Sequence, residues 1–199
     1  QNLVLTYEVF SKLGDFKSGK LIFDRIWKHS IDVAGTSMLL ARDEGVDAEI
    51  ENFAFTAGLL HEIGKIILLI NFPEKFKEFL EVKLRNRDRS NHEMEEEVFG
   101  FSHAKIGAHL VGLWGLPDPI VEAILFHETP AECTSSTPSP LTFVHVANAF
   151  EEEMLKEGDL NVPFKIDQGY LRMVGLHHRI PKWIEQYQGT YGDIDLDKL

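Results

Sequence analysis

Apolar residues along this chain recur every three or four positions, with polar residues filling the intervals. That spacing turns one face of an α-helix toward a core, whereas a half-buried strand would show strict alternation. Glycine and proline punctuate the pattern where helices are expected to end. The predicted helices lie near 2–13, 19–42, 47–61, 64–71, 73–87, 102–114, 118–128, 140–157, 167–175 and 179–188, and the predicted breaks lie at Gly14, Gly45, Pro73, Gly100, Gly115 with Pro117, and Gly158. The pattern predicts an all-α fold, a multi-helix bundle.

One short run leaves an alternative to helix open. The residues IILLI at 66–70 are all aliphatic, and the β-branched isoleucines among them favour strands. The run is too short for its periodicity to decide between the two structures. A strand at 66–70 is therefore the main alternative to an entirely helical fold.

An adjacent imidazole and carboxylate, His61 and Glu62, interrupt the otherwise apolar stretch FTAGLLHEIGKIILL at 55–69. Ionisable side chains are rarely fully buried unless they are paired or bind a metal. Both groups are ordinary ligands for zinc and for harder divalent ions, and Gly64 is expected to break the helix and open space beside them. A buried histidine with one backbone partner is the simpler alternative, and the doublet alone leaves both open.

Four further apolar segments each carry a histidine, which is more than core packing usually requires. The histidines are His29 in LIFDRIWKHSIDVAGTSMLLA, His103 in SHAKIGAHLVGLW, His127 in PIVEAILFHE, and His145, with Asn148, in LTFVHVANAF. In the second of these segments Ser102 can cap the helix, while Gly107 and Ala108 would let a neighbouring helix approach closely. The remaining histidines, His92, His109, His177 and His178, have no comparable setting and are expected at the surface.

The order of these motifs resembles the HDOD domain, the HD-related output domain of bacterial signalling proteins. The segments FTAGLLHEIGK and HAKIGAHLVGLWGLPDPIVEAILFH carry most of the resemblance, which runs from about residue 20 to residue 178. It implies a single HDOD or HD-like helical domain over residues 1–199. The opening QNLVLTYEVFSKL is similar to the helix that follows the family's N-terminal helical half. We therefore expect that half to be missing here and the chain to be part of a longer regulatory protein.

The same resemblance implies a metal site with altered ligands. HD hydrolases hold their metal with a His, an adjacent His-Asp pair and a distant Asp, which match His29, His61, Glu62 and Asn148. His103 and His127 match positions that supply imidazoles to a second metal in the related HD-GYP phosphodiesterases. The carboxylate of Glu62 lies one methylene farther out than that of Asp, and Asn148 offers only a neutral carbonyl oxygen. The resemblance thus implies a divalent metal that binds weakly or partially.

Two alternatives remain open for these six residues. They could form a polar network in the core, in which each imidazole donates to a carbonyl or carboxylate without any ion. Lys65, in the IGK segment, could pair with Glu62 or face a bound anion. The acidic run EMEEEVFG at 93–100 is interpreted as a solvated helix face, although its carboxylates could also touch the histidine pocket.

The resemblance favours a signalling function over hydrolysis. The HD-GYP substrate motif would follow a His-His-Glu, but the chain continues from His127 as HETPAECTSSTPSP and has no Gly-Tyr-Pro element. Hydrolysis also needs a well-held ion that lowers the pKa of bound water. We therefore predict a signal-transduction output and interaction module, non-catalytic, whose partner is another protein or another domain of the same regulatory protein. A metal-dependent phosphohydrolase is the alternative.

Composition limits the partners and the cellular compartment that we expect for this domain. A formal net charge of −12 opposes sequence-independent binding to nucleic acid, which relies on Lys and Arg. Cys133 is the only cysteine, so an internal disulfide is excluded. No signal peptide is visible, and no apolar run is expected to reach the ~20 residues of a membrane span. A cytoplasmic location without a membrane partner is predicted.

Overall fold

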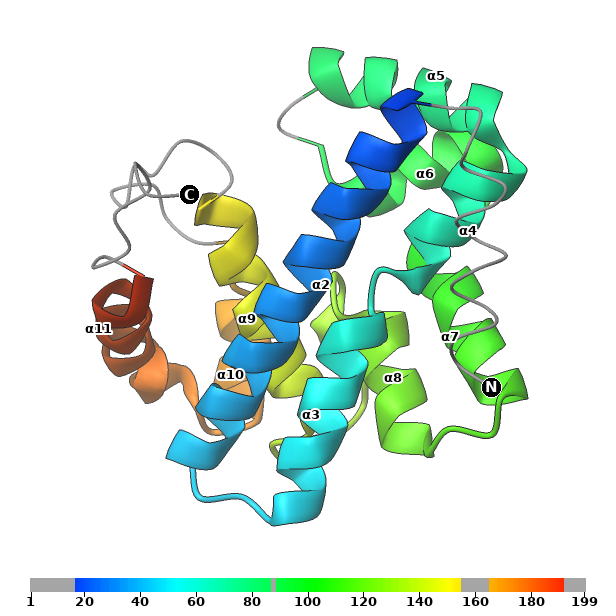
Figure 1. The fold of residues 1–199 in the computed structure, drawn as a ribbon. Helices are drawn as coiled ribbons and strands as arrows, with labels where there is room; N and C mark the ends of the chain where they lie inside the picture. Colours follow the sequence, from blue (N-terminus) through cyan, green and yellow to red (C-terminus); the bar gives the residue numbers. More distant parts are fainter. Residues whose placement is uncertain (1–16, 87–88, 155–164, 192–199) are drawn as a thin grey trace.

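The computed structural model of the protein describes residues 17–86, 89–154 and 165–191, which form helices and contain no strand (Figure 1). Helix α2 crosses the front of the molecule, with α3 beside it and α5 and α6 above. The α-helices are α2 (Lys17–Asp43), α3 (Ala48–Leu60), α4 (Ile63–Asn71), α5 (Pro73–Arg85), α6 (Asn91–Phe99), α7 (His103–Leu113), α8 (Asp118–Phe126), α9 (Pro140–Met154), α10 (Gln168–Met173) and α11 (Ile180–Tyr191). Short 3-10 turns, η1 (Pro130–Glu132) and η2 (His177–Arg179), complete the described chain.

The all-α prediction is confirmed, and each predicted segment between 19 and 188 corresponds to an observed helix. Residues 66–70 lie inside α4, so the strand alternative is wrong. Helices α2 and α6 end where Gly45 and Gly100 take φ values of 67° and 85°, which suit glycine. The predicted helix at 2–13 and the breaks at Gly14 and Gly158 lie outside the described residues.

Two hydrophobic clusters form the core, and the turn between α3 and α4 lies where they meet. The larger cluster joins the C-terminal half of α2 to α3, α7, α8, α9, α10 and α11. The smaller cluster joins the start of α2 to α4, α5 and α6, with Phe76, Phe79 and Phe99 in mutual ring contact. Ile63, the first residue of α4, packs against both clusters. The doublet His61 and Glu62 directly precedes it, which places the doublet in the interior.

Helix α4 meets the first turn of α7 at backbone contact distance, and this approach requires Gly64. A Cβ atom at position 64 would lie 2.0 Å from the carbonyl oxygen of His103. Gly107 in α7 lies on the other side of the contact. A Cβ atom added to Gly107 would lie 3.4 Å from the backbone nitrogen of Gly64. The predicted close approach of a neighbouring helix at Gly107 is confirmed. The prediction that Gly64 breaks the helix is wrong, because Gly64 lies within α4 and the chain turns before it, at His61 and Glu62.

Residues Ala48–Asn71 are long and apolar enough to cross a membrane, and the most apolar 18-residue window in this segment has a mean hydropathy of 1.7. The expectation that no apolar run reaches this length is therefore wrong. The segment comprises α3, the turn and α4, and 56% of its most apolar window is buried inside the domain. Core helices have the same composition, so this finding is weak evidence for a membrane span.

The C-terminal helix α11 is joined to the end of α2 by charged and aromatic contacts. Arg179 donates from Nε to Glu44, at 2.6 Å, and from a terminal nitrogen to Asp43, at 2.9 Å. The indole of Trp183 is buried and donates to Glu44 at 2.9 Å. Charged hydrogen bonds are stronger than neutral ones, and here they fix the ends of two helices that are far apart in sequence.

We predict that Gly64→Ala destabilises the domain by about 1–3 kcal/mol, because the new methyl group would force α4 away from α7. Gly112→Ala is the matched control, since Gly112 lies in α7 and a Cβ added there would meet no atom within 4 Å. Replacing a helical glycine there should be neutral or stabilising by up to ~1 kcal/mol. Urea unfolding of both variants measures the difference, and equal effects would show that the close approach is not required.

Glu151 on α9 is buried against α2, where it accepts a hydrogen bond of 3.1 Å from Thr36. Burial and the neighbouring Asp32 raise the pKa of Glu151 to about 7. The folded state therefore keeps a proton that the unfolded chain loses near the ordinary value of 4.5. Because the unfolded state binds fewer protons between these values, stability falls as pH rises from about 4.5 to about 7.

We predict that Glu151→Gln abolishes most of this loss, since the amide resembles the protonated acid and carries no charge. At pH 8 the variant should be more stable than the wild type by on the order of 1–3 kcal/mol, and at pH 4.5 the two should be nearly equal. Thermal unfolding between pH 4 and pH 8 measures this. Glu49→Gln, on the exposed first turn of α3, controls for net charge. Parallel pH profiles of wild type and Glu151→Gln would contradict the assignment.

Candidate metal centre

Side chains from five parts of the chain converge between the two hydrophobic clusters. His29 lies in α2, His103 opens α7, and Asn148 lies in α9. His61 and Glu62 form the turn between α3 and α4, while His127 directly follows α8. His29 Nε2 lies 3.3 Å from His61 Nε2 and 3.0 Å from Asn148 Oδ1, and His103 Nε2 lies 3.2 Å from His127 Nε2. The six residues predicted from sequence therefore surround one site.

Backbone carbonyls fix the orientation of two of the imidazoles. His61 Nδ1 donates to the carbonyl of Gly58 at 2.7 Å, and His127 Nδ1 donates to that of Ile124 at 2.8 Å. Each carbonyl lies three residues earlier, at the end of the preceding helix. A carbonyl oxygen only accepts, so Nδ1 carries the proton and, in the neutral ring, Nε2 presents a lone pair to the site. This is the tautomer that a metal ligand requires.

A carboxylate orients the third imidazole. Glu95 on α6 is fully buried and accepts from the backbone nitrogen of His103 at 2.7 Å and from its Nδ1 at 2.6 Å. The interpretation of 93–100 as a solvated face is therefore wrong for Glu95. It holds for the exposed Glu97, which pairs with Arg89. A carboxylate behind a histidine is the common second-layer partner of a metal ligand.

The spacing of the facing nitrogens fits a shared ion. Two nitrogens bound to one ion at ~2.0–2.1 Å lie ~3.0 Å apart at octahedral angles and ~3.4 Å apart at tetrahedral ones. The two Nε2 pairs, at 3.3 Å and 3.2 Å, fall within this range. Histidine and carboxylate atoms form two groups that could each hold an ion: His29, His61 and Glu62, and Glu62, His103 and His127.

Glu62 belongs to both groups and lies between them. Its Oε1 is 3.5 Å from His61 Nε2, and its Oε2 is 3.9 Å from His103 Nε2. Lys65, one turn along α4, donates to Oε1 at 2.5 Å, which confirms the predicted pairing. Oε2 is buried and has no hydrogen-bond partner among the described residues. An orphaned buried carboxylate oxygen is costly and fits a position where a cation binds.

Burial and charge set the protonation of the site. Burial lowers the pKa of His61 well below its ordinary value and that of His127 to about 4, so both rings are neutral near pH 7. Burial alone would raise the pKa of Glu62, but Lys65 and the nearby imidazoles hold it well below its usual range. For His103, burial and Lys65 are outweighed by Glu95 and Glu62, so its pKa is raised. The site thus contains a charged carboxylate facing two neutral imidazoles.

His145 is excluded from the site by its own hydrogen bonds. Its Nδ1 donates to the carbonyl of His127 at 2.8 Å, and its Nε2 accepts from the backbone nitrogen of Asp167 at 2.9 Å. Both ring nitrogens are occupied, so His145 joins α9 to the segment before α10 and leaves no lone pair for an ion. The apolar pattern alone did not separate this histidine from the other four, whereas the family motifs did not include it in the predicted site.

Two acids near the site were not among the six predicted residues, although the contact of Glu95 with His103 bears out the alternative left open for the 93–100 carboxylates. Glu95 lies beside buried Met94 in α6, and this apolar neighbour was the available signal. Glu128 directly follows His127, accepts from Asn91 at 3.2 Å through Oε1, and has a buried Oε2 without a partner among the described residues. The electrostatic influence of Glu128 reaches both His127 and Lys65. Both acids add negative charge around the imidazoles.

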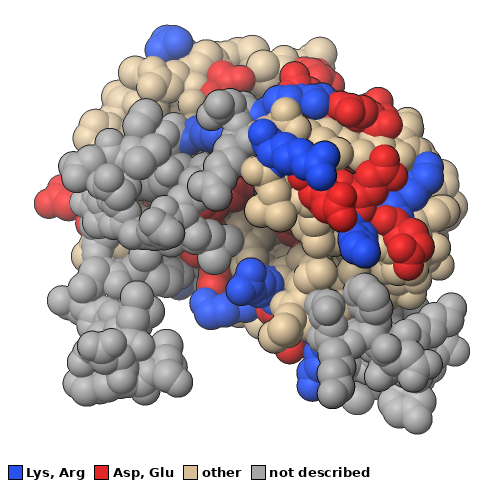
Figure 2. Space-filling view, turned by 90° about the horizontal axis from the view of Figure 1, so that it is seen from above, with Lys and Arg blue, Asp and Glu red and all other residues tan. Residues whose placement is uncertain are grey.

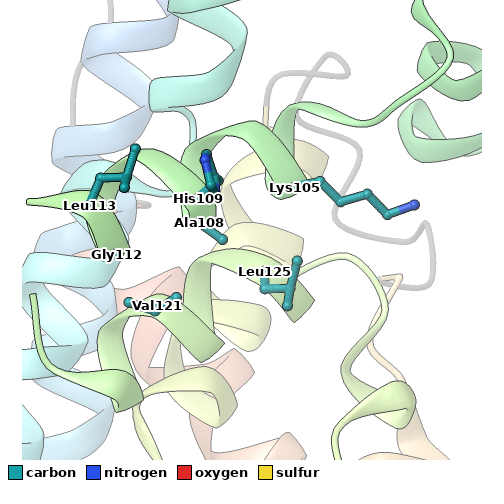
Figure 3. Close-up of a pocket in the computed structure, with 7 residues that line it drawn as sticks. All are labelled: Lys105, Ala108, His109, Gly112, Leu113, Val121 and Leu125. Carbon is teal, nitrogen blue, oxygen red and sulfur yellow. The ribbon is translucent and has the colours of Figure 1, made fainter.

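The surface pockets found among the described residues lie away from the histidine cluster. A groove of about 450 Å³ lies between α7 and α8, with Val121 and Leu125 on one wall and His109 and Leu113 on the other (Figure 3). It is mainly apolar and lies outside the histidine cluster. On the face seen from above, acidic and basic side chains are interspersed among the described residues (Figure 2).

Comparison with known proteins agrees with an HD-like helical domain. A crystal structure from Shewanella amazonensis, provisionally called a phosphohydrolase, superposes with a TM-score of 0.62 at 22% identity and covers 83% of this chain and 59% of its own. The MmoQ response regulator from Methylococcus capsulatus gives 0.53 at 19% identity, covering 83% and 60%. A curated relative, Ribonuclease Y from Acetivibrio thermocellus, is 30% identical over 128 residues, which is 64% of this chain and 18% of the relative.

The sequence profile of the HDOD domain matches residues 1–130, and the chain belongs to the HDOD domain family. The match includes His29, His61, Glu62, His103 and His127 and ends before Asn148. The chain spans a fifth or less of the length of the first curated relatives that it matches.

We predict that the double variant Glu62→Asp and Asn148→Asp binds Mn²⁺ or Zn²⁺ about tenfold or more tightly than the wild type, because it restores an acid at each changed position. Isothermal titration on protein never exposed to chelator measures the affinity. His109→Ala, in the surface groove, is a control that should leave binding unchanged. An unchanged affinity in the double variant would show that these positions do not form the site.

Proposed function

We propose that this chain is an output and interaction domain of a larger bacterial regulatory protein, which keeps the imidazoles of an HD site but does not turn over a phosphodiester. Membership of the HDOD family and the likeness to a response regulator support the signalling part of this proposal. The partner would be another domain of the same protein or a second protein. Neither nucleic acid nor a membrane is part of the proposal.

The observation that carries the non-catalytic part is the contact between His29 and Asn148. His29 Nε2 lies 3.0 Å from Asn148 Oδ1, the position where an HD hydrolase would place a carboxylate. An amide oxygen accepts this hydrogen bond without a negative charge, so the contact between His29 Nε2 and Asn148 needs no ion. Lowering the pKa of bound water requires a firmly held dication. An amide in place of the acid removes one negative charge from the site, so the site holds a dication less firmly.

The same pocket favours cations over anions. Glu62, Glu95 and Glu128 supply carboxylates around the imidazoles, and Lys65 is the buried cation between them. If a divalent ion binds, His103, His127 and Glu62 would hold it, with His29, His61 and Asn148 beside them. Such an ion would act as a Lewis acid in a hydrolase. In this domain, the residues would instead use an ion to fix the positions of α4, α7 and α8.

Phosphoester hydrolysis is the second candidate. Two facing imidazole pairs that share Glu62 resemble the layout of a two-metal site, in which two ions clamp the attacking and leaving oxygens. The likeness to Ribonuclease Y and to the Shewanella amazonensis protein favours it. Against it stands the net charge of −12, which repels polyanionic substrates such as RNA unless bound ions neutralise the pocket.

We predict no phosphodiesterase turnover above background. The assay offers cyclic dinucleotides, nucleoside triphosphates, short RNA and a chromogenic phosphodiester, each with Mn²⁺, Fe²⁺, Zn²⁺ or Ni²⁺ added. Wild-type rates should equal those of His61→Ala, because the site lacks an ion held firmly enough to activate water. The Glu62→Asp and Asn148→Asp variant is included because it restores both acids, so hydrolysis is expected in this variant before any other. Turnover by the wild type that is lost in His61→Ala and kept in His109→Ala would favour the enzyme.

A further inference from the structure

Lys65 occupies an unusual position for an ammonium group. Its Nζ lies 2.5 Å from Glu62 Oε1, and the side chain is almost wholly buried. Both residues belong to the same short stretch of chain, since Lys65 lies in the first turn of α4 and Glu62 directly precedes that helix. The ammonium is thus tethered to the carboxylate that the two candidate ion groups share.

The backbone and the carboxylate hold this ammonium in place. Its Nζ donates to Glu62 Oε1, and the pairing offsets the cost of burying the charge. The close approach of α4 to α7 at Gly64 also fixes the backbone beside Lys65. The ammonium therefore lies directly at Oε1 of Glu62.

Geometry limits how far from Lys65 an ion on the same oxygen could lie. A zinc or similar ion binds a carboxylate oxygen at ~2.0–2.2 Å. Since Nζ lies 2.5 Å from Oε1, an ion bound to Oε1 would lie within ~4.7 Å of the ammonium. The divalent ion and the ammonium would repel each other strongly at that distance, because the interior is poorly solvated. Oε2 lies on the His103 side and has no hydrogen-bond partner among the described residues.

We propose that Lys65 is a built-in competitor for the metal: it excludes a divalent ion from the group formed by His29, His61 and Glu62 Oε1, and leaves the group formed by His103, His127 and Glu62 Oε2 open. This proposal rests on the proposed metal site and adds what regulates its occupancy. The wild type would then bind at most one ion per chain. Removal of the Lys65 charge would allow a second.

The experiment titrates Zn²⁺ and, separately, Mn²⁺ into the full 199-residue chain and measures stoichiometry and affinity by isothermal titration, with ion content checked by elemental analysis. Lys65→Met removes the ammonium, and Lys65→Gln removes the charge while keeping a donor for Glu62, should the first variant fold poorly. Lys65→Arg keeps the charge. Lys77→Met removes a lysine charge from an exposed position of the same helix, α5.

The expected result is one ion or fewer in the wild type, Lys65→Arg and Lys77→Met, and two ions in Lys65→Met or Lys65→Gln. The added ion should bind roughly tenfold or more tightly than any second ion in the wild type. Combining Lys65→Met with His61→Ala should return the count to one. Without metal, Lys65→Met should melt at a lower temperature than the wild type, and metal should raise its melting temperature by more.

Equal stoichiometry and affinity in the wild type and both neutral variants, with ions bound, would overturn the role of Lys65 and leave the metal site standing. Absence of binding in every variant, including the neutral ones, would overturn both proposals. An equal gain in Lys77→Met would also overturn the proposal, because it would show a general effect of net charge instead of competition at Oε1.

Discussion

The backbone of α4 lies so close to the first turn of α7 that one methyl group at position 64 would collide with the carbonyl oxygen of His103. The polar centre depends on this approach. It sets His103 opposite His127 at 3.2 Å and brings Glu62, just before α4, to 3.9 Å from the same ring. Helix α3 meets α2 in a similar way, because a Cβ at Gly58 would lie 2.8 Å from the Ala34 Cα. Two glycines thus permit the helix spacing on which both halves of the centre depend.

Protons on the imidazoles connect the side chains of the centre. His61 and His127 each use Nδ1 for a carbonyl and present a lone pair at Nε2. Each lone pair faces the Nε2 of a second imidazole, His29 or His103, and only a proton or a cation between two such nitrogens avoids repulsion. The raised pKa of His103, secured by Glu95 and Glu62 against burial, supplies that proton on one side. Ion binding would have to displace it, so metal affinity and proton affinity are linked at these atoms.

Sequence reasoning predicted the helices and the convergence of the six site residues, because both are recorded in local patterns and in family motifs. It failed where the outcome depended on how helices meet. Glu95 lies in a run of acids that reads as solvated, and only the turn at Gly100 and Phe101 between α6 and α7 brings it back onto His103. Gly64 was predicted to break a helix, but its role is to let α4 approach α7. The sequence of one helix does not show how closely another helix packs against it. His145 matched the pattern of a ligand until its two hydrogen bonds were seen.

The difference between the two oxygens of Glu62 gives the centre its asymmetry. Oε1 faces Lys65 and His61, whereas Oε2 faces His103 and lacks a hydrogen bond among the described residues. A single carboxylate therefore faces an internal cation with one oxygen and has no hydrogen bond among the described residues at the other. Asn148 reinforces this asymmetry, because its neutral oxygen pairs with His29 Nε2 on the side that Lys65 already occupies. The half of the centre near α2 and α9 therefore needs no ion at these two contacts. In the half near α7 and α8, an ion would replace the proton between His103 and His127 and would meet the carboxylate oxygen that Lys65 does not contact.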